Sequence, residues 1–385
     1  MIKELNLNEQ YRDIFALSQF AFQYTLSEKE LELKRQEAER HMIWGIMEND
    51  KIAAKLHLIP LAVNIMGKQM QMGGVASVAT WPEYRRNGMV RKLLKHALKY
   101  MRENGQVLSY LHPFSVPFYR KYGYEIAFNE KKYKIPFAKL KKDWGTKGYV
   151  RRIEPDIPLL NTIYPQYAKK YTGSLVRDEK WWKQRVLKDN YHIAIAYNDE
   201  HSPEGYIIFE VKEKLFTVVE IAYRSLSGLR LLMEFISNHD SMAEHAEFVV
   251  PENDNMPLLL DEPRFETKVD PYFMARVVDV IGFLKQYPTT VGRESISIFV
   301  EDSFLPENTG VYYVNPTTDG LTCTVIKTEG KAEIHCTIQQ FTSMFLGYKR
   351  PRELAALGLI EGSQEAVEKL ENLIPNQQTY LPDFF

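Results

Sequence analysis

A strand, an arginine-rich loop and an amphipathic helix follow one another over residues 75–104, and this succession constrains the fold more than any other segment. The apolar positions of the helix recur at the i, i+3, i+4, i+7 spacing of a helix that faces a core: Val90, Leu93, Leu94, Ala97, Leu98 and Met101. Gly105 stands where a glycine commonly ends a helix. A further strand-like run covers 107–111. The pattern predicts an α/β domain over residues 1–148.

The rest of the chain divides into two further units. At about 150 residues per domain, 385 residues predict two or three domains. Residues 149–288 alternate helical and strand-like runs, and residues 289–385 begin with strands and then become helical, as in a small α+β domain. The run 316–320 predicts a turn between two strands of this last unit. The expected fold class is therefore mixed, with α/β and α+β parts.

One segment of the second unit repeats the pattern of the first. A glycine at 228 opens a helix after the strand-like run 218–222, just as Gly88 opens one after 75–79. The offset of 228 − 88 = 140 residues has the size of a domain and is too long for a solenoid repeat. The repeat has two interpretations, a duplicated domain or a chance similarity of one segment.

Composition excludes several classes of protein. The chain has 49 basic and 50 acidic residues, a net charge of −1, which disfavours a dedicated nucleic-acid binder. No run of about 18 apolar residues predicts a membrane span, and the polar N-terminus has no apolar signal core, so we expect a cytoplasmic protein. The two cysteines, Cys323 and Cys336, cannot form a disulfide framework or a four-thiolate zinc site. No metal site is expected.

The loop before the first amphipathic helix favours a bound anion. Arg85, Arg86 and Arg91 surround the start of the helix, where the helix dipole already disfavours cations. Gly88 lets the backbone approach a ligand, free N–H groups of the first turn can bind phosphate oxygens, and Asn87 is a suitable N-cap residue. The alternative is a solvated basic turn with an ordinary cap. Neither a Walker loop nor a dinucleotide fingerprint is present.

These residues resemble motif A of the GNAT acetyltransferases. In that superfamily a strand such as 75–80 precedes a loop of pattern Q/R-x-x-G-x-G/A, and this chain reads Arg85-Arg86-Asn87-Gly88-Met89-Val90. Val90 departs from the final small residue, a departure that resembles the enhanced-intracellular-survival (Eis) branch. The segment 118–124 is similar to the aromatic-Tyr-x-x-aromatic-Gly-Tyr segment of that branch. Its architecture, two tandem GNAT-like domains and a C-terminal sterol-carrier-protein-like domain, fits the three units.

The resemblance implies a function and a set of site residues. It implies direct acetyl transfer from acetyl-CoA to an amine, with Tyr119 as general acid and the carboxylate of Phe385 as general base. Aminoglycosides or polyamines are the implied acceptors, with a lysine side chain of a polypeptide or a metabolite as the alternative, and a homohexamer is the implied assembly. The implied acetyl-CoA site consists of Val78, Ala79, Thr80, Arg85, Arg86, Asn87, Gly88, Met89, Val90, Arg91, Phe114 and Ser115. Ser225 and Leu226 replace the two loop arginines in the second copy, which predicts one acetyl-CoA site per chain.

Alternative interpretations stay open. Tyr119 is one of 23 tyrosines and is also interpretable as a core aromatic, and the apolar tail as a segment that only packs. His112 fits a proton shuttle or a structural histidine, and Asp383, beside the terminus, is a carboxylate that the sequence offers to a cationic acceptor, with any further carboxylates left open. The alternative function is a non-catalytic acetyl-CoA sensor or a lipid-binding protein that uses the third domain.

Overall fold

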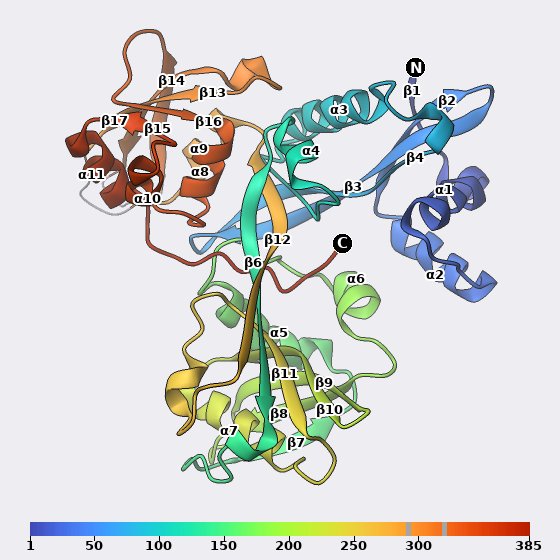
Figure 1. Ribbon diagram of the computed structural model, residues 1–385, viewed down its shortest axis with the longest axis vertical. Helices are drawn as coiled ribbons and strands as arrows, with labels where there is room; N and C mark the ends of the chain where they lie inside the picture. Colours follow the sequence, from blue (N-terminus) through green and yellow to red (C-terminus); the bar gives the residue numbers. More distant parts are fainter. Residues whose placement is uncertain (290–293, 318–321) are drawn as a thin grey trace.

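The computed structural model describes residues 1–289, 294–317 and 322–385. Two lobes share one twisted sheet, and a third, smaller unit with its own sheet lies beside the upper lobe (Figure 1). Among the described residues the large sheet has the strand order β1-β2-β3-β4-β5-β12-β6-β11-β10-β9-β8-β7, and the small sheet has the order β15-β14-β13-β16-β17. No helix of the described residues is long and apolar enough to span a membrane.

The first lobe is built from the N-terminal third of the chain. Its elements are β1 (Ile2–Glu4), α1 (Leu7–Phe22), α2 (Glu28–Ala38), β2 (Met42–Glu48), β3 (Lys51–Ile65), β4 (Lys68–Thr80), the 3-10 turn η1 (Pro82–Tyr84), α3 (Met89–Glu103), β5 (Leu108–Leu111), α4 (Val116–Arg120) and β6 (Glu125–Pro136). The amphipathic α3 buries the predicted side chains Leu93, Leu94, Ala97, Leu98 and Met101 against the sheet, while Val90 is partly buried. Gly105 adopts a φ of 71° just past the helix, as its position predicted.

Strand β4 changes direction beside its neighbours. It pairs with the parallel β5 only over Met72–Gly74, and beyond that point the two strands diverge. Its pairing with β3 is interrupted between Lys55 and His57, where β4 carries one extra residue and Ser77 has a φ of 50°. This β-bulge turns the end of β4 away from β5. The edge of β4 after Gly74 is therefore unpaired on the β5 side.

The second lobe repeats this arrangement. Its elements are η2 (Phe137–Lys139), β7 (Tyr149–Ile153), α5 (Ile157–Ala168), α6 (Glu179–Trp181) with the π-helical turn η3 (Trp182–Val186), β8 (His192–Tyr197), β9 (Pro203–Lys212), β10 (Leu215–Tyr223), α7 (Leu226–Ser237), β11 (His245–Val250), η4 (Met256–Leu259) and β12 (Glu266–Val277). In the first lobe β4 is antiparallel to β3 and parallel to β5, and α3 follows it. In the second lobe β10 is likewise antiparallel to β9 and parallel to β11, and α7 follows it. Even the register shift recurs, between Val218 and Glu220. The predicted duplication is confirmed.

Two long strands join the lobes. Strand β12 pairs with β5 of the first lobe through Met274–Val277, and with β6 along most of its length. Strand β6 in turn pairs with β11 of the second lobe. In Figure 1 both strands run from the upper lobe into the lower one. The two GNAT-like units therefore form one continuous sheet.

The third unit packs helices on a small sheet. Its elements are α8 (Val280–Gln286), β13 (Ile296–Glu301), η5 (Pro306–Asn308), β14 (Gly310–Pro316), β15 (Cys323–Thr328), β16 (Ile334–Thr337), α9 (Ile338–Phe345), α10 (Pro351–Ala356), β17 (Glu361–Gly362) and α11 (Gln364–Leu373). Of the turn predicted over 316–320, residues 318–320 lie outside the described residues. After α11 the tail leaves this unit and crosses the centre of the molecule toward α6 (Figure 1).

Candidate active site

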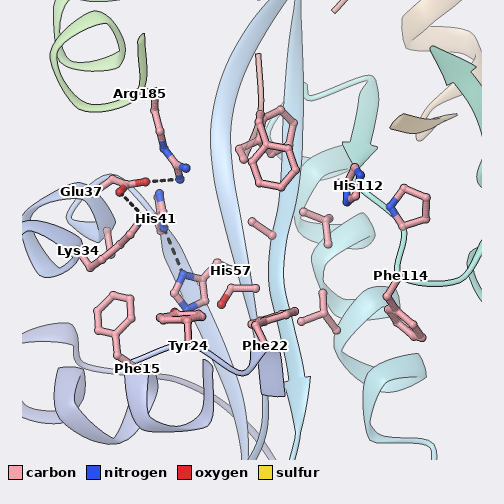
Figure 2. A pocket seen from close by; sticks show the side chains of 18 of the residues that line it. Phe15, Phe22, Tyr24, Lys34, Glu37, His41, His57, His112, Phe114 and Arg185 are labelled. Atoms are coloured by element: carbon pink, nitrogen blue, oxygen red, sulfur yellow. Dashed lines mark hydrogen bonds and ion pairs between the residues drawn. The ribbon is translucent and has the colours of Figure 1, made fainter. Parts of the chain in front are cut away.

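A cavity of about 500 Å³ opens where the N-terminal helices, the free edge of β4 and the C-terminal tail meet. Its size is that of a small-molecule site. The lining residues come from all three units of sequence: Phe15, Phe22, Tyr24, Lys34, Glu37, Ala38, His41, His57, Val75, Ala76, Ser77, Val78, His112, Pro113, Phe114, Tyr119, Arg185, Phe384 and Phe385. In Figure 2 the labelled side chains of Lys34, Glu37, His41, His57 and Arg185 lie on one side of the β-strands, and His112 and Phe114 lie on the other.

Tyr119 belongs to the short helix α4 and lies in an aromatic cluster. Its ring contacts those of Phe114 and Phe118 edge to face, with centroid distances of 5.4 and 5.2 Å. Only 3% of the residue is exposed, and burial raises the pKa of its hydroxyl above the usual value of 10. The hydroxyl makes no hydrogen bond with the described residues, and Tyr119 lines the cavity. A protonated phenol is thus available to a ligand in the cavity.

The C-terminal tail is anchored before it reaches the cavity. The backbone of Tyr380 donates to Thr172, and the hydroxyl of Ser174 donates to the carbonyl of Tyr380 at 2.8 Å. The guanidinium of Arg177 donates to Asp383 at 2.9 Å, and the indole of Trp181 donates to the same oxygen at 2.7 Å. These contacts fix the last residues of the sequence.

Phe385, at the end of that tail, is buried. Its ring packs on those of Phe273 and Trp181, with centroid distances of 5.0 and 6.1 Å. A side chain at Gly74 would come within 2.7 Å of this ring, so the glycine makes room for it. Phe384 is exposed and contacts His112. The tail therefore forms one wall of the cavity.

The arginine-rich loop has the geometry of an anion site. Arg86 and Gly88 both adopt the left-handed conformation, with φ of 67° and 69°. Gly88, and not the predicted Asn87, is the N-cap of α3, and no side chain caps this helix. The correction follows from the backbone, since a cap with φ of 69° suits glycine and leaves the first N–H groups free.

The three arginines of the loop are not neutralised by acidic side chains of the described residues. Arg85, Arg86 and Arg91 are exposed and form no ion pair with the described residues. Arg85 donates to the carbonyl of Thr80 at 3.4 Å. The loop thus combines uncapped N–H groups with unpaired cations, as phosphate binding requires.

The corresponding helix of the second lobe differs at its start. Ser225 is the N-cap of α7, and its hydroxyl accepts from the backbone N–H of Gly228 at 3.0 Å. A side chain at Gly228 would also lie 2.5 Å from the carbonyl of Glu204. The first turn of α7 is therefore capped and crowded, where that of α3 is open.

The predicted site residues fall into two groups. Val78, Phe114, Tyr119 and Phe385 line the cavity together. Ala79 and Thr80 end β4 next to the arginine-rich loop. Residues 85–91, which form this loop and the start of α3, do not line the cavity. Ser115 is the N-cap of α4, next to Phe114. Strand β4 thus leads from the loop to the cavity.

A polar network at the bulge of β4 was not predicted. Nζ of Lys55 lies 2.8 Å from the hydroxyl of Ser77 and 3.0 Å from Nε2 of His57, whose Nδ1 lies 3.2 Å from Nδ1 of His41. Burial lowers the pKa of Lys55 to about 7 and that of His41 to about 3. The available signal was a lysine and a histidine two residues apart in an apolar strand sequence, 53–65.

A charged triad on the cavity wall was not predicted either. The carboxylate of Glu37 forms an ion pair with Nζ of Lys34, at 2.9 Å from Oε2, and a second ion pair with the guanidinium of Arg185 (Figure 2). Arg185 belongs to the π-helical turn of the second lobe. Because it is far from Glu37 in the sequence, no local sequence pattern could predict this contact. No group of three or more His, Cys, Asp or Glu side chains in the described parts of the chain could hold a metal ion.

Comparison with known families agrees with this architecture. Family models described as acetyltransferase (GNAT) domains match residues 2–127 and 173–277, and one described as a sterol carrier protein domain matches residues 280–382. The N-acetyltransferase Eis of Mycobacterium tuberculosis is 24% identical over 306 residues, 74% of this chain and 72% of the relative. An uncharacterized N-acetyltransferase of Streptomyces griseus is 20% identical over 357 residues, 83% of each chain.

Solved structures share the whole fold. A protein of Enterococcus faecalis described as a probable N-acyltransferase superposes with a TM-score of 0.92 at 28% identity, covering 100% of this chain and 99% of that one. Eis1 of Mycobacterium abscessus has the same fold, with a TM-score of 0.85 at 18% identity over 100% of each chain. The chain belongs to the GNAT superfamily and is an Eis-like N-acetyltransferase with two GNAT domains and a C-terminal sterol-carrier-protein-like domain.

Proposed function

We propose that the cavity transfers an acetyl group from acetyl-CoA directly to an amine, with Tyr119 as proton donor and the carboxylate of Phe385 as proton acceptor. The observation that carries the proposal is the meeting of Tyr119, Phe385 and the free edge of β4 in one cavity. A GNAT N-acetyltransferase needs these three things in one place: a strand edge for the acyl donor, a proton donor and an acceptor.

The proposed reaction is a direct transfer of the acetyl group from sulfur to nitrogen. The neutral amine attacks the thioester carbonyl carbon, a C–N bond forms and the C–S bond breaks. The amine loses one proton to the carboxylate of Phe385, and the leaving sulfur takes one proton from Tyr119. The products are the N-acetyl amine and CoA with a free thiol. Solvent then restores the starting protonation states of the Tyr119 hydroxyl and the Phe385 carboxylate.

Tyr119 enters the reaction protonated because burial raises the pKa of its hydroxyl. A phenol with a usual pKa near 10 is a weaker acid than a thiol with a pKa near 8.5. Complete proton transfer to the sulfur is therefore uphill, so Tyr119 first stabilises the developing thiolate by a hydrogen bond, and its proton then passes to the sulfur as solvent reprotonates the phenolate. The unpartnered hydroxyl supports this role, since it has no competing acceptor among the described residues.

The residues for acetyl-CoA follow the course of β4. Backbone groups of Val78, Ala79 and Thr80 offer hydrogen bonds along the unpaired edge, and Phe114 and Ser115 border the thiol end. Residues 85–91 would hold the pyrophosphate through the uncapped start of α3. The capped start of α7 supports one acetyl-CoA site per chain.

Thiol release from acetyl-CoA, with mass spectrometry of the product, tests the proposal. The panel contains aminoglycosides and polyamines, which the family resemblance implies, together with simple monoamines. Thiol release that depends on an amine, with the N-acetyl amine as product, supports the proposal. Acetyl-CoA binding without amine-dependent release would contradict it and favour the sensor or lipid-carrier alternative.

Other features implied by the resemblance stay predictions. A homohexamer is testable by sedimentation, and a cytoplasmic location by fractionation. The proposed domain limits, 1–148, 149–288 and 289–385, are testable by limited proteolysis, although the strands shared between the lobes argue against independent folding of the first two.

A further inference from the structure

The position of the Tyr119 hydroxyl depends on the short segment that carries it. The aromatic rings in contact with that of Tyr119 belong to the same stretch of chain, 114–124: Phe114, Phe118 and Tyr124. The hydroxyl itself makes no hydrogen bond with the described residues. The location of the hydroxyl in the cavity therefore follows the backbone of α4 and of the turn after it.

Side chains from outside this segment bind two carbonyl groups at the end of α4. The last carbonyl groups of a helix have no partner within the helix. The carbonyl of Arg120 accepts from Nε2 of Gln339 at 3.0 Å, in addition to the N–H of Gly123 at 3.1 Å. The carbonyl of Tyr122 accepts from Nη1 of Arg276 at 2.5 Å. Gln339 belongs to α9 of the third unit and Arg276 to β12, so both donors are distant from α4 in sequence.

The third unit also holds Arg276. Asp302, directly after β13, pairs with Nη2 of this guanidinium at 2.5 Å, and both side chains are buried. The backbone N–H groups of Phe304 and Leu305 donate to Oδ1 of Asp302, at 3.1 and 2.9 Å. The side-chain amide of Asn308 donates to Oδ2 at 3.0 Å. These bonds fix the carboxylate, which in turn orients the guanidinium toward the turn after α4.

The turn after α4 packs closely on these groups. Gly123 has a φ of 80°, which favours glycine. A Cβ at this position would lie 2.6 Å from Nη1 of Arg276 and 3.1 Å from Cγ2 of Ile338 in the third unit. The ring of Tyr122 contacts that of Phe304 edge to face, with a centroid distance of 4.9 Å. Polar and apolar contacts with the third unit therefore both fix the end of the segment that carries Tyr119.

We infer that Arg276 and Gln339 are positioning residues for the acetyl transfer, through which the third unit holds α4 and with it the hydroxyl of Tyr119. This role rests on the proposed function of Tyr119 as proton donor. Neither Arg276 nor Gln339 is among the cavity-lining residues, so both act through the backbone of the α4 segment. A displacement of about 1 Å at a reacting group can cost about a hundredfold in rate. The third unit thus contributes to catalysis through α4 as well as through the tail.

The first test compares Gln339→Met with Tyr348→Phe. Gln339→Met keeps the length of a half-buried side chain and removes the donor to Arg120. Tyr348→Phe is the matched control, because the hydroxyl of Tyr348 also joins the third unit to the first lobe, at Asn129 of β6 instead of α4. With the fastest amine of the panel, we expect Gln339→Met to lower kcat about threefold, with unchanged KM for acetyl-CoA and melting temperature. The control should keep wild-type kcat, and a wild-type kcat of Gln339→Met would overturn the inference.

The second variant is Arg276→Lys. Removing one partner of a buried ion pair strongly destabilises a protein, so this substitution keeps a positive charge beside Asp302. An ammonium lacks the planar set of donors with which the guanidinium reaches Asp302 and the carbonyl of Tyr122 together. We expect kcat to fall about tenfold, again with unchanged KM for acetyl-CoA. A fall in acetyl-CoA affinity with normal kcat would contradict the positioning role.

Double variants with Tyr119→Phe separate positioning from a general structural role. A residue that acts only through the Tyr119 hydroxyl has no effect on kcat once this hydroxyl is removed. We therefore expect Gln339→Met and Arg276→Lys to leave the kcat of Tyr119→Phe unchanged. The same fold-loss of kcat in both backgrounds would overturn the inference. A Tyr119→Phe enzyme as fast as wild type would instead refute the proposed proton donor, and the positioning role with it.

Discussion

The ammonium nitrogen of Lys55 lies 2.8 Å from the hydroxyl oxygen of Ser77, the residue with positive φ at the bulge of β4. Lys55 also donates to the carbonyl of Ser77 at 3.3 Å and forms no ion pair with the described residues. The side chain thus holds the bulge that separates β4 from β5. Ser77, next to the proposed acetyl-CoA residue Val78, connects this network to the cavity.

Titration of Lys55 makes stability depend on pH. Burial lowers its pKa from 10.5 to about 7 in the folded protein. Between pH 7 and 10.5 the unfolded chain therefore binds the proton that the folded chain has lost, and the free energy of unfolding rises with pH across this window. Below pH 7 both states bind the proton and the contribution is constant.

The variant Lys55→Met should remove that rise. The difference in unfolding free energy between wild type and variant is measured by denaturant titration from pH 7 to 10. We expect it to change by roughly 1.4 kcal/mol for each pH unit within this window. Lys51→Met, at an exposed position of the same strand, serves as control. A difference that stays constant over the window would refute a lowered pKa for Lys55.

Much of the first lobe could be predicted from sequence because its signals are local. The apolar spacing of α3 and the glycine after it determine a helix whatever packs on it. The bulge of β4 was not predictable, because its support, Lys55, is 22 residues away in the chain. The insertion of β12 between β5 and β6 depends on strand pairing between the lobes, which no single segment encodes.

The residues of the candidate site also divide into those with a local sequence signal and those that only distant contacts bring together. The loop arginines and Gly88 were recognisable because they are contiguous in sequence. Glu37, Arg185 and the imidazoles of His41 and His57 were missed, since distant segments bring them together. The tail is the intermediate case. Its apolar composition predicted packing, but its anchors at 172–181 lie about two hundred residues earlier.

Charge neutralisation in the loop should weaken acetyl-CoA binding. The triple variant Arg85→Gln, Arg86→Gln, Arg91→Gln is expected to raise the dissociation constant about tenfold or more at low salt, and less at high salt, because exposed charges are screened. Arg230→Gln, in the first turns of the capped helix α7, should bind as wild type does. Isothermal titration should give one acetyl-CoA per chain. Two sites, or a normal affinity of the triple variant, would contradict the single-site proposal.

Adding one alanine after Phe385 tests the proposed base. The extension moves the carboxylate by about 3.5 Å while the anchors at Tyr380 and Asp383 stay in place. We expect kcat to fall about a hundredfold, with unchanged melting temperature and acetyl-CoA affinity. An alanine inserted between Met1 and Ile2 is the control. An extended chain with normal kcat would exclude the carboxylate as base and leave the acetyl transfer standing.

The proposed acetyl transfer is tested most directly by amine-dependent thiol release of Tyr119→Phe compared with Tyr122→Phe, at saturating concentrations of both substrates. Both tyrosines belong to one aromatic cluster, but only Tyr119 lines the cavity. We predict that Tyr119→Phe lowers kcat about a hundredfold without changing acetyl-CoA affinity, and that Tyr122→Phe keeps wild-type kcat. A Tyr119→Phe enzyme as fast as wild type would contradict the proposed role of this tyrosine in the acetyl transfer.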